Sequence, residues 1–116
     1  MKKRFAVVTR GGVQLIPLES IIYLENDRRK IIVHTLDGTF EFYGRMNDAM
    51  NNLDDRFINC HRSFAINMEH VSEMCNQSIT FCNNSRIFMG RDTFAETRRR
   101  VRNFNEENAK KSNENP

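Results

Sequence analysis

Residues 30–43 read KIIVHTLDGTFEFY, and this stretch decides the fold class. Its first half, Lys30–Thr35, is rich in Ile and Val, and in its second half, residues 39–43, Phe alternates with polar residues. β-Branched and aromatic side chains with a period of two are typical of strands. Asp37-Gly38 lies between the two runs and predicts a β-hairpin with a type I′ turn, which needs a positive φ at both central residues.

Strand patterns continue on both sides of this hairpin. Asn83-Asn84 predicts the turn of a second hairpin, because Asn tolerates the left-handed region. A polar, charged loop is expected over Glu25–Arg29. The remaining expected strands are Arg4–Thr9, Val13–Ile16, Ile21–Leu24, Ser78–Cys82 and Arg86–Met89, together with Phe57–Cys60 and Ser63–Ile66, which form two short strands or one bent strand.

Two helices are expected. Residues 45–53 place Met46, Ala49, Met50 and Leu53 on one helical face. A second helix is predicted to start near Asp92, where Thr93 and Glu96 have the spacing of a capping box. The fold class predicted from these elements is mainly β, with small antiparallel sheets and two short helices.

Length and composition favour one domain followed by a tail. The chain has 116 residues, of which about a quarter are Val, Ile, Leu or Phe, enough for a core. Residues 105–116 contain none of these four types, so we expect a folded domain over 1–104 and a disordered polar tail over 105–116. No apolar run approaches the ~20 residues that span a bilayer. Three cysteines without paired spacing fit a reducing compartment, and a soluble, cytoplasmic protein is expected.

Catalysis and metal binding are not expected. Cys60 and His61 are adjacent, so in a strand their side chains would point to opposite faces, which is wrong for a nucleophile and its base. The cysteines and histidines match no common zinc spacing, and no phosphate-binding glycine loop follows a strand. We therefore predict no enzyme activity, no cofactor and no metal.

Positive charge is concentrated in three segments. The net charge is only +3. Residues 28–30 are all basic, residues 56–67 hold two arginines and no acid, and residues 84–104 hold six arginines against two acids. The rest of the chain is therefore acidic on balance. Such segregation is typical of a surface that attracts phosphate backbones.

One stretch carries a family resemblance. Residues 57–67 read FINCHRSFAIN, and they follow SIIYL at 20–24 and TFEFYG at 39–44. This combination resembles the LytTR family of DNA-binding domains, named for bacterial response regulators of the LytR, AgrA and AlgR kind. The resemblance covers about residues 13–104 and implies an elongated stack of small antiparallel sheets. It also implies that loop side chains enter successive major grooves of B-DNA.

The resemblance implies roles for particular residues. Lys30, Arg62 and Arg91 fall at the family's base-reading positions, one in each basic segment. Arginine can bond guanine with two parallel hydrogen bonds, so Arg62 and Arg91 are the better candidates for base readout. His61, Ser63 and Asn67 would support the loop, and Asn59 stands where the family often has a basic residue. The expected phosphate contacts are Arg28, Arg29, Arg86, Arg98, Arg99 and Arg100.

The leading functional hypothesis is therefore sequence-specific binding of double-stranded DNA within a bacterial transcriptional regulator of a two-component system. The resemblance implies paired direct repeats in promoters as the target and a dimer on DNA. A receiver domain or sensory partner would lie outside this sequence. The alternatives are an RNA-binding β module and a small β protein-interaction domain. RNA binding is disfavoured because the Phe residues mostly alternate along strands, as core residues do.

Overall fold

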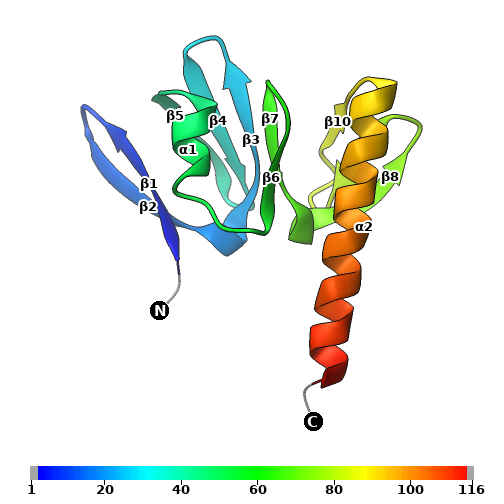
Figure 1. Cartoon of the computed structure of the whole chain (residues 1–116). Helices are drawn as coiled ribbons and strands as arrows, with labels where there is room; N and C mark the ends of the chain where they lie inside the picture. The colour runs from blue at the N-terminus through cyan, green and yellow to red at the C-terminus, as the bar shows by residue number, and fades with distance from the viewer. Residues whose placement is uncertain (1–2, 115–116) are drawn as a thin grey trace. The chain divides into compact units, whose positions relative to one another are not determined.

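Nearly half of the chain forms antiparallel β-strands in three sheets, which confirms the predicted mainly β fold. The computed structural model describes residues 3–114 (Figure 1). The chain divides between Asn67 and Met68 into two compact parts, unit 1 and unit 2, whereas the length favoured a single compact domain. Each of the three sheets belongs to one unit, and each unit buries apolar side chains of its own.

Unit 1 is built on a five-stranded sheet in the order β5–β4–β3–β7–β6. The central strand β3 pairs with both β4 and β7, so the β3–β4 turn and the β6–β7 turn emerge at the same end of the sheet. The first four residues of β3 are buried, because neighbouring elements cover both of its faces. The strands are β3 (Ile21–Asp27), β4 (Lys30–Thr35), β5 (Gly38–Tyr43), β6 (Phe57–His61) and β7 (Phe64–Asn67).

A separate two-stranded sheet, β1 (Arg4–Thr9) and β2 (Gly12–Pro17), packs beside β5. Phe5 and Val7 alternate along β1 and are both buried. The ring centroids of Phe5 and Phe42 lie 5.8 Å apart, within the range of favourable aromatic pairs. These contacts fix one face of the β1–β2 hairpin against the core of unit 1.

The helix α1 (Met46–Met50) is shorter than the helix predicted over residues 45–53. Beyond it, backbone bonds of the i to i+3 type, from Asn52 to Ala49 and from Leu53 to Met50, close the chain into turns. The side chains predicted for its apolar face do face the core of unit 1: Met46 and Ala49 are buried, and Met50 and Leu53 pack against them.

The hairpin of residues 30–43 is confirmed, but its predicted turn type is wrong. The two turn residues are Leu36 and Asp37, because Thr35 pairs with Gly38. Only Gly38 has a positive φ, +133°, a value that L residues rarely adopt. The Thr35 hydroxyl donates to the Gly38 carbonyl (2.8 Å) and accepts from the Asp37 N–H (3.1 Å). These local bonds close a turn that is displaced by one residue.

Unit 2 is a three-stranded sheet in the order β10–β9–β8 with the helix α2 against it (Figure 1). The sequence predicted the hairpin of β9 and β10, and Asn84 in its turn has a φ of +70°. It missed β8, whose residues are all exposed or half-buried, a weak signal for a strand. The elements are β8 (Val71–Cys75), β9 (Ser78–Phe81), β10 (Arg86–Phe88) and α2 (Arg91–Glu114).

The helix α2 is neither short nor capped as predicted. It begins at Arg91, so Thr93 is already inside it, and the Thr93 carbonyl accepts a bond from the Thr97 hydroxyl (2.8 Å). It continues to Glu114, through ten residues that were expected to belong to a disordered tail. No Gly or Pro interrupts residues 91–114, and adding a residue to an existing helix costs little.

Candidate nucleic-acid interface

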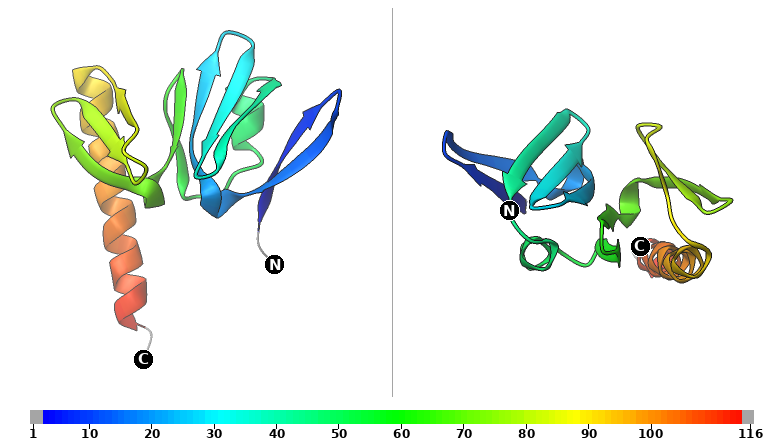
Figure 2. Two further views of the ribbon diagram at one scale, coloured as in Figure 1. Left: turned by 180° about the vertical axis from the view of Figure 1, so that it is seen from behind. Right: turned by 90° about the horizontal axis from the view of Figure 1, so that it is seen from above.

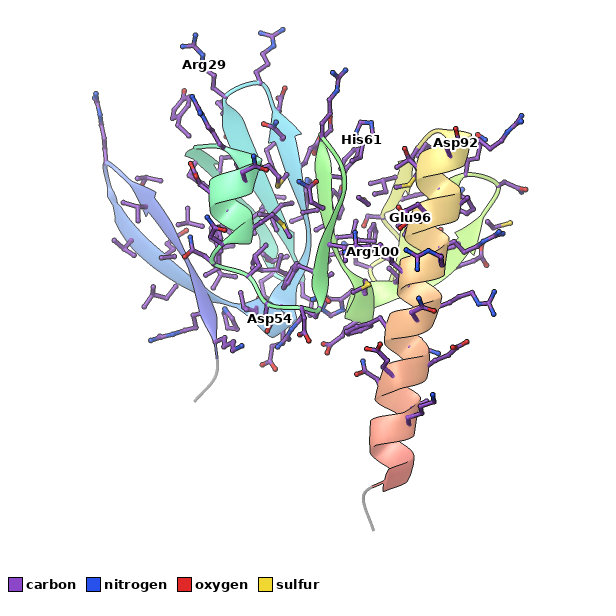
Figure 3. All side chains as sticks on the ribbon, in the orientation of Figure 1. Arg29, Asp54, His61, Asp92, Glu96 and Arg100 are labelled. Carbon is purple, nitrogen blue, oxygen red and sulfur yellow. The ribbon has the colours of Figure 1, made fainter. Side chains whose placement is uncertain are left out.

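The β3–β4 turn has only two residues, Arg28 and Arg29, because Asp27 pairs with Lys30. The loop predicted over Glu25–Arg29 is thus shorter than expected, since its first three residues continue β3. Both arginines are exposed, and neither has an ion-pair partner within the described part of the chain. In Figure 3 the Arg29 side chain extends beyond the end of the sheet.

The backbone of this turn is held in a strained and fixed conformation. Arg28 has a φ of +62°, where a Cβ atom is disfavoured. The Gly44 N–H donates to the Arg29 carbonyl at 3.0 Å, which ties the turn to the chain leaving β5. Arg45 follows directly and is exposed, so it adds a basic side chain that counting charge by segment had missed. Strain of this kind commonly occurs at binding sites.

Lys30, unlike Arg28 and Arg29, has charged and aromatic partners within unit 1. It pairs with Tyr43 of β5, and its Nζ lies 3.7 Å from Glu41 Oε2 and 5.9 Å from the centroid of the Tyr43 ring. An exposed ion pair of this kind contributes little energy. Lys30 can therefore exchange Glu41 for a phosphate or a base, but it is a weaker candidate for readout than an unpaired arginine.

The β6–β7 turn presents Arg62 at its tip. His61 pairs with Phe64, so Arg62 and Ser63 alone form the turn. The Ser63 N–H donates to His61 Nδ1 at 3.1 Å, and the Asn26 N–H of β3 donates to the Ser63 carbonyl at 2.8 Å. The turn is thus closed on itself and attached to the central strand. Arg62 is exposed and has no ion-pair partner among residues 3–110.

Asn67 lies inside the core at the other end of β7, away from the β6–β7 turn. It is completely buried, and its Nδ2 donates to the Ile21 carbonyl at 2.9 Å. That carbonyl lies where the β3–β4 register shifts, between Ile21 and Tyr23. The amide therefore satisfies a backbone group beside an irregular point of the ladder, and it joins β7 to β3.

In unit 2, Arg91 is the first residue of α2 and is exposed. The Met89 N–H donates to the Gln77 carbonyl at 3.0 Å, which fixes the chain just before the helix. Arg86 is also exposed, and its Nε donates to Thr80 Oγ1 at 3.2 Å on the neighbouring strand. Arg86 is therefore partly oriented by the sheet, whereas Arg91 is free to bind a ligand.

Four arginines of α2 are exposed but not equivalent: Arg98, Arg99, Arg100 and Arg102. Arg99 binds Glu96 through Nε–Oε2 (3.1 Å) and a second N–O contact, and Arg102 Nη2 lies 3.9 Å from Glu106 Oε1. The hydrogen bond from Arg99 lowers the pKa of Glu96, which keeps that carboxylate charged. Figure 3 shows Glu96 and Arg100 on this helix. Among these four, Arg98 and Arg100 form no ion pair in the described region, although the charge of Arg100 also lowers the pKa of Glu96.

No group of three His, Cys, Asp or Glu side chains within the described residues could hold a metal ion. No helix in the range 3–114 is long and apolar enough to cross a membrane.

Comparison with known families decides between the functional classes. The family model of the LytTr DNA-binding domain matches residues 11–102, most of the chain. The chain belongs to the LytTR family. This confirms the resemblance that the sequence indicated at residues 57–67. It also supports DNA binding over the RNA-binding and protein-interaction alternatives.

Relatives of this LytTR domain agree with the assignment. Accessory gene regulator protein A from Staphylococcus aureus strains N315 and MW2 is 30% identical over 61 residues, which cover 51% of this chain and 25% of the relative. The chain therefore spans about a quarter of the length of these curated relatives. A solved structure described as the LytTr DNA-binding domain of a putative methyl-accepting/DNA response regulator from Bacillus cereus matches with a TM-score of 0.70. It is 22% identical, and the match covers 87% of this chain and 97% of that one.

The LytTR predictions for single residues have a plausible geometry in each unit. Unit 1 brings Arg28, Arg29, Lys30 and Arg62 to one end of one sheet. His61 bonds the β6–β7 turn at that end, whereas Asn67 lies at the opposite end of β7. Unit 2 places Arg91 at the start of α2. The assignment of these side chains to bases or phosphates stays a prediction.

Proposed function

We propose that this LytTR domain recognises a specific sequence in double-stranded DNA through three groove-reading positions. Arg62 and Lys30 act on the two turns of unit 1, and Arg91 acts at the start of α2. The observation that carries the proposal is the geometry of the two turns. Each has only two residues, and they project unpaired arginines from the same end of a hydrogen-bonded sheet. A two-stranded β-ribbon fits the major groove, which is about 12 Å wide.

The two kinds of basic residue have different tasks. The Arg62 fork can bond the O6 and N7 atoms of guanine, which discriminates between base pairs by roughly 1–3 kcal/mol. Arg28 and Arg29 lie on the neighbouring turn and bind phosphates, which sets the register without reading sequence. On unit 2, the phosphate contacts come first from Arg98 and Arg100, because Arg99 and Arg86 already have intramolecular partners.

The biological role that follows is that of the DNA-binding part of a bacterial transcriptional regulator, acting in the cytoplasm on paired direct repeats. A receiver domain or another sensory partner supplies the signal, and two copies occupy the two repeats. The S. aureus relatives, which are about four times as long as the matched segment, support such an organisation.

Selection from random duplexes tests the proposal. We expect enrichment of one motif that is directly repeated, and binding that weakens steeply between low and moderate salt. With the selected duplex, Arg62→Ala should weaken binding by about 1–3 kcal/mol and relax one base position. Arg62→Lys keeps the charge but lacks the planar fork, so it should also lose the base preference.

Arg4→Ala is the matched control. Arg4 is an exposed arginine at the start of β1, at the opposite end of the β1–β2 hairpin from its turn. Its removal should leave affinity unchanged. Equal losses for Arg62→Ala on selected and scrambled duplexes would assign Arg62 to the backbone. Absence of any enriched motif would contradict sequence-specific binding.

A further inference from the structure

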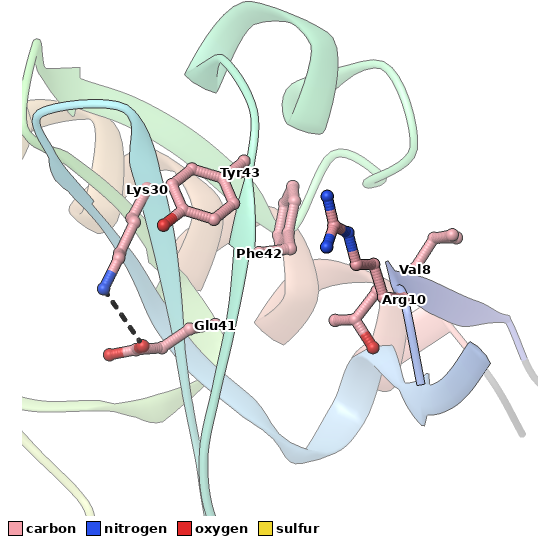
Figure 4. Close-up of a pocket in the computed structure, with 7 residues that line it drawn as sticks. Val8, Arg10, Lys30, Glu41, Phe42 and Tyr43 are labelled. Atoms are coloured by element: carbon pink, nitrogen blue, oxygen red, sulfur yellow. Dashed lines mark ion pairs between the residues drawn. The ribbon is translucent and has the colours of Figure 1, made fainter. Parts of the chain in front are cut away.

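A cleft lies in unit 1 between the tip of the β1–β2 hairpin and β5 (Figure 4). Its volume is about 760 Å³, and it opens to solvent beside the strand that pairs with Lys30. The polar groups that line it come from Thr9, Arg10, Lys30, Glu41 and Tyr43. None of the DNA contacts assigned above explains why Arg10 lies in this cleft.

Charge in the cleft is unevenly compensated. The Glu41 carboxylate faces Lys30, with Nζ and Oε2 3.7 Å apart. Arg10 is exposed and has no acidic partner in the described part of unit 1. In Figure 4 its guanidinium lies beside Phe42, on the far side of β5 from the Lys30–Glu41 pair. Arg10 is thus the positive charge that remains available to an incoming anion.

The turn of the β1–β2 hairpin allows a ligand to approach its backbone closely. Thr9 pairs with Gly12, so the turn consists of Arg10 and Gly11 alone. Gly12 has a φ of +146°, which favours glycine, and a Cβ at Gly11 would meet only Thr9 Oγ1, at 3.8 Å. The two glycines therefore leave the backbone of this tip without side chains of its own over Gly11 and Gly12. Glycine is typical of places where backbone approaches a ligand closely.

The tip also lies on the DNA-facing end of unit 1. Figure 1 and the reverse view in Figure 2 both show the β1–β2 and β3–β4 turns at the same end. The sheet order places β5, and the β1–β2 hairpin beside it, on the opposite side of β4 from β7. Along the bound duplex, the hairpin tip would therefore lie beyond the β3–β4 turn, away from Arg62.

We infer that Arg10 and the glycine tip of the β1–β2 hairpin bind a DNA backbone phosphate at the mouth of this cleft. The inference rests on the proposed function and extends the footprint of unit 1. Because this hairpin packs beside β5 as a separate sheet, its contact would lie further along the duplex than those of the β3–β4 turn, on the side away from Arg62.

Salt titrations of duplex binding test the contact. A plot of the logarithm of the binding constant against the logarithm of the salt concentration has a negative slope. Loss of one phosphate contact makes this slope less steep by about 0.9, which is roughly an eightfold loss of affinity at 0.1 M salt. Arg10→Ala should show this loss equally on selected and scrambled duplexes, with an unchanged melting temperature. Arg10→Lys, which keeps the charge, should retain the slope. Arg4→Ala, from the other end of the same hairpin, should behave as the unmodified protein.

Single methylphosphonate substitutions then locate the phosphate. Each substitution removes the charge of one backbone position in the selected duplex. With the unmodified protein, we expect one sensitive position beyond those protected by the β3–β4 turn, on the side away from the position of Arg62. With Arg10→Ala, that position should lose its sensitivity while the others keep theirs.

The outcomes separate this inference from the proposed function. An Arg10→Ala variant with the normal slope and normal methylphosphonate pattern would overturn the inference, and Arg62→Ala would still show its loss on the selected duplex. If Arg62→Ala lost no specificity while the salt slope of Arg10→Ala became less steep by about 0.9, Arg10 would be confirmed as a phosphate contact. The assignment of Arg62 to a base would then be wrong. Failure of the unmodified protein to bind duplex DNA at low salt would overturn both.

Discussion

Arg28→Gly should make the protein more stable and a poorer DNA binder at the same time. Arg28 has a φ of +62° in a turn of two residues. A left-handed conformation costs an L residue about 1–2 kcal/mol. Glycine removes that strain, although its greater freedom in the unfolded chain costs about 0.5–1 kcal/mol. The net expectation is an increase of about 0.5–1 kcal/mol in the free energy of unfolding, or about 2–6 °C in melting temperature.

The same substitution removes an exposed charge that the proposal assigns to a phosphate. The slope of log K against log salt should fall by about 0.9, and affinity at 0.1 M salt by roughly eightfold. Thermal unfolding followed by circular dichroism, together with fluorescence anisotropy on a labelled duplex, measures both effects on the same samples.

Two companion variants separate strain from charge. Arg28→Ala removes the charge but keeps a Cβ at positive φ, so it should lose the same affinity without gaining stability. Arg29→Gly changes a neighbour whose φ is not positive, so it should lower the free energy of unfolding by about 0.5–1 kcal/mol. The argument from strain is refuted if Arg28→Gly melts no higher than Arg28→Ala. Unchanged affinity in both Arg28 variants would remove Arg28 from the interface.

Three further predictions concern the helix, the core and the C-terminal residues. Glu96→Gln frees Arg99 from its carboxylate partner, so the affinity for any duplex should rise and the salt dependence of binding should become steeper. An unchanged salt dependence in anisotropy titrations would exclude Arg99 as a phosphate contact. Asn67→Ala leaves the buried Ile21 carbonyl without its donor, so the free energy of unfolding measured in urea should fall by about 1–3 kcal/mol. A loss below about 0.5 kcal/mol would show that the Asn67 hydrogen bond does not stabilise the core. Deletion of 105–116 should leave the melting temperature within about 2 °C, since most of the described side chains there are exposed, and a larger drop would show that this part of α2 packs.

The sequence predicted the strands of unit 1 well because their signal is local. Alternation over residues 30–43 and the apolar face around Met46 follow directly from which side chains meet the core. The strand β8 was missed, because its half-exposed residues carry little hydrophobic pattern. The turn at Asp37-Gly38 was displaced by one residue, because the bonds of the Thr35 hydroxyl decided its register.

The candidate site was harder to predict than the strands. Counting charge along the sequence located the basic segments. It could not show which basic side chains form ion pairs within the protein and which are left to bind a ligand. Lys30 faces Glu41 and Arg99 binds Glu96, whereas Arg62 and Arg91 have no such partner in the described chain. Arg10 and Arg45 stood alone among neutral neighbours, so no segment count could find them. Strand pairing and the hydrogen bond from Gly44 to Arg29 bring them to the end of unit 1 that carries the β3–β4 turn (Figure 1).

The two-residue turns of unit 1 have a consequence for how new target sequences arise. Their tips bear no part of the core, so a side chain such as Arg62 can be exchanged without repacking the sheet beneath it. Operator preference can therefore drift, or be engineered, one turn at a time while the scaffold stays constant. Because the tips are already ordered before DNA arrives, good and poor operators should capture the protein at similar rates and differ in residence time.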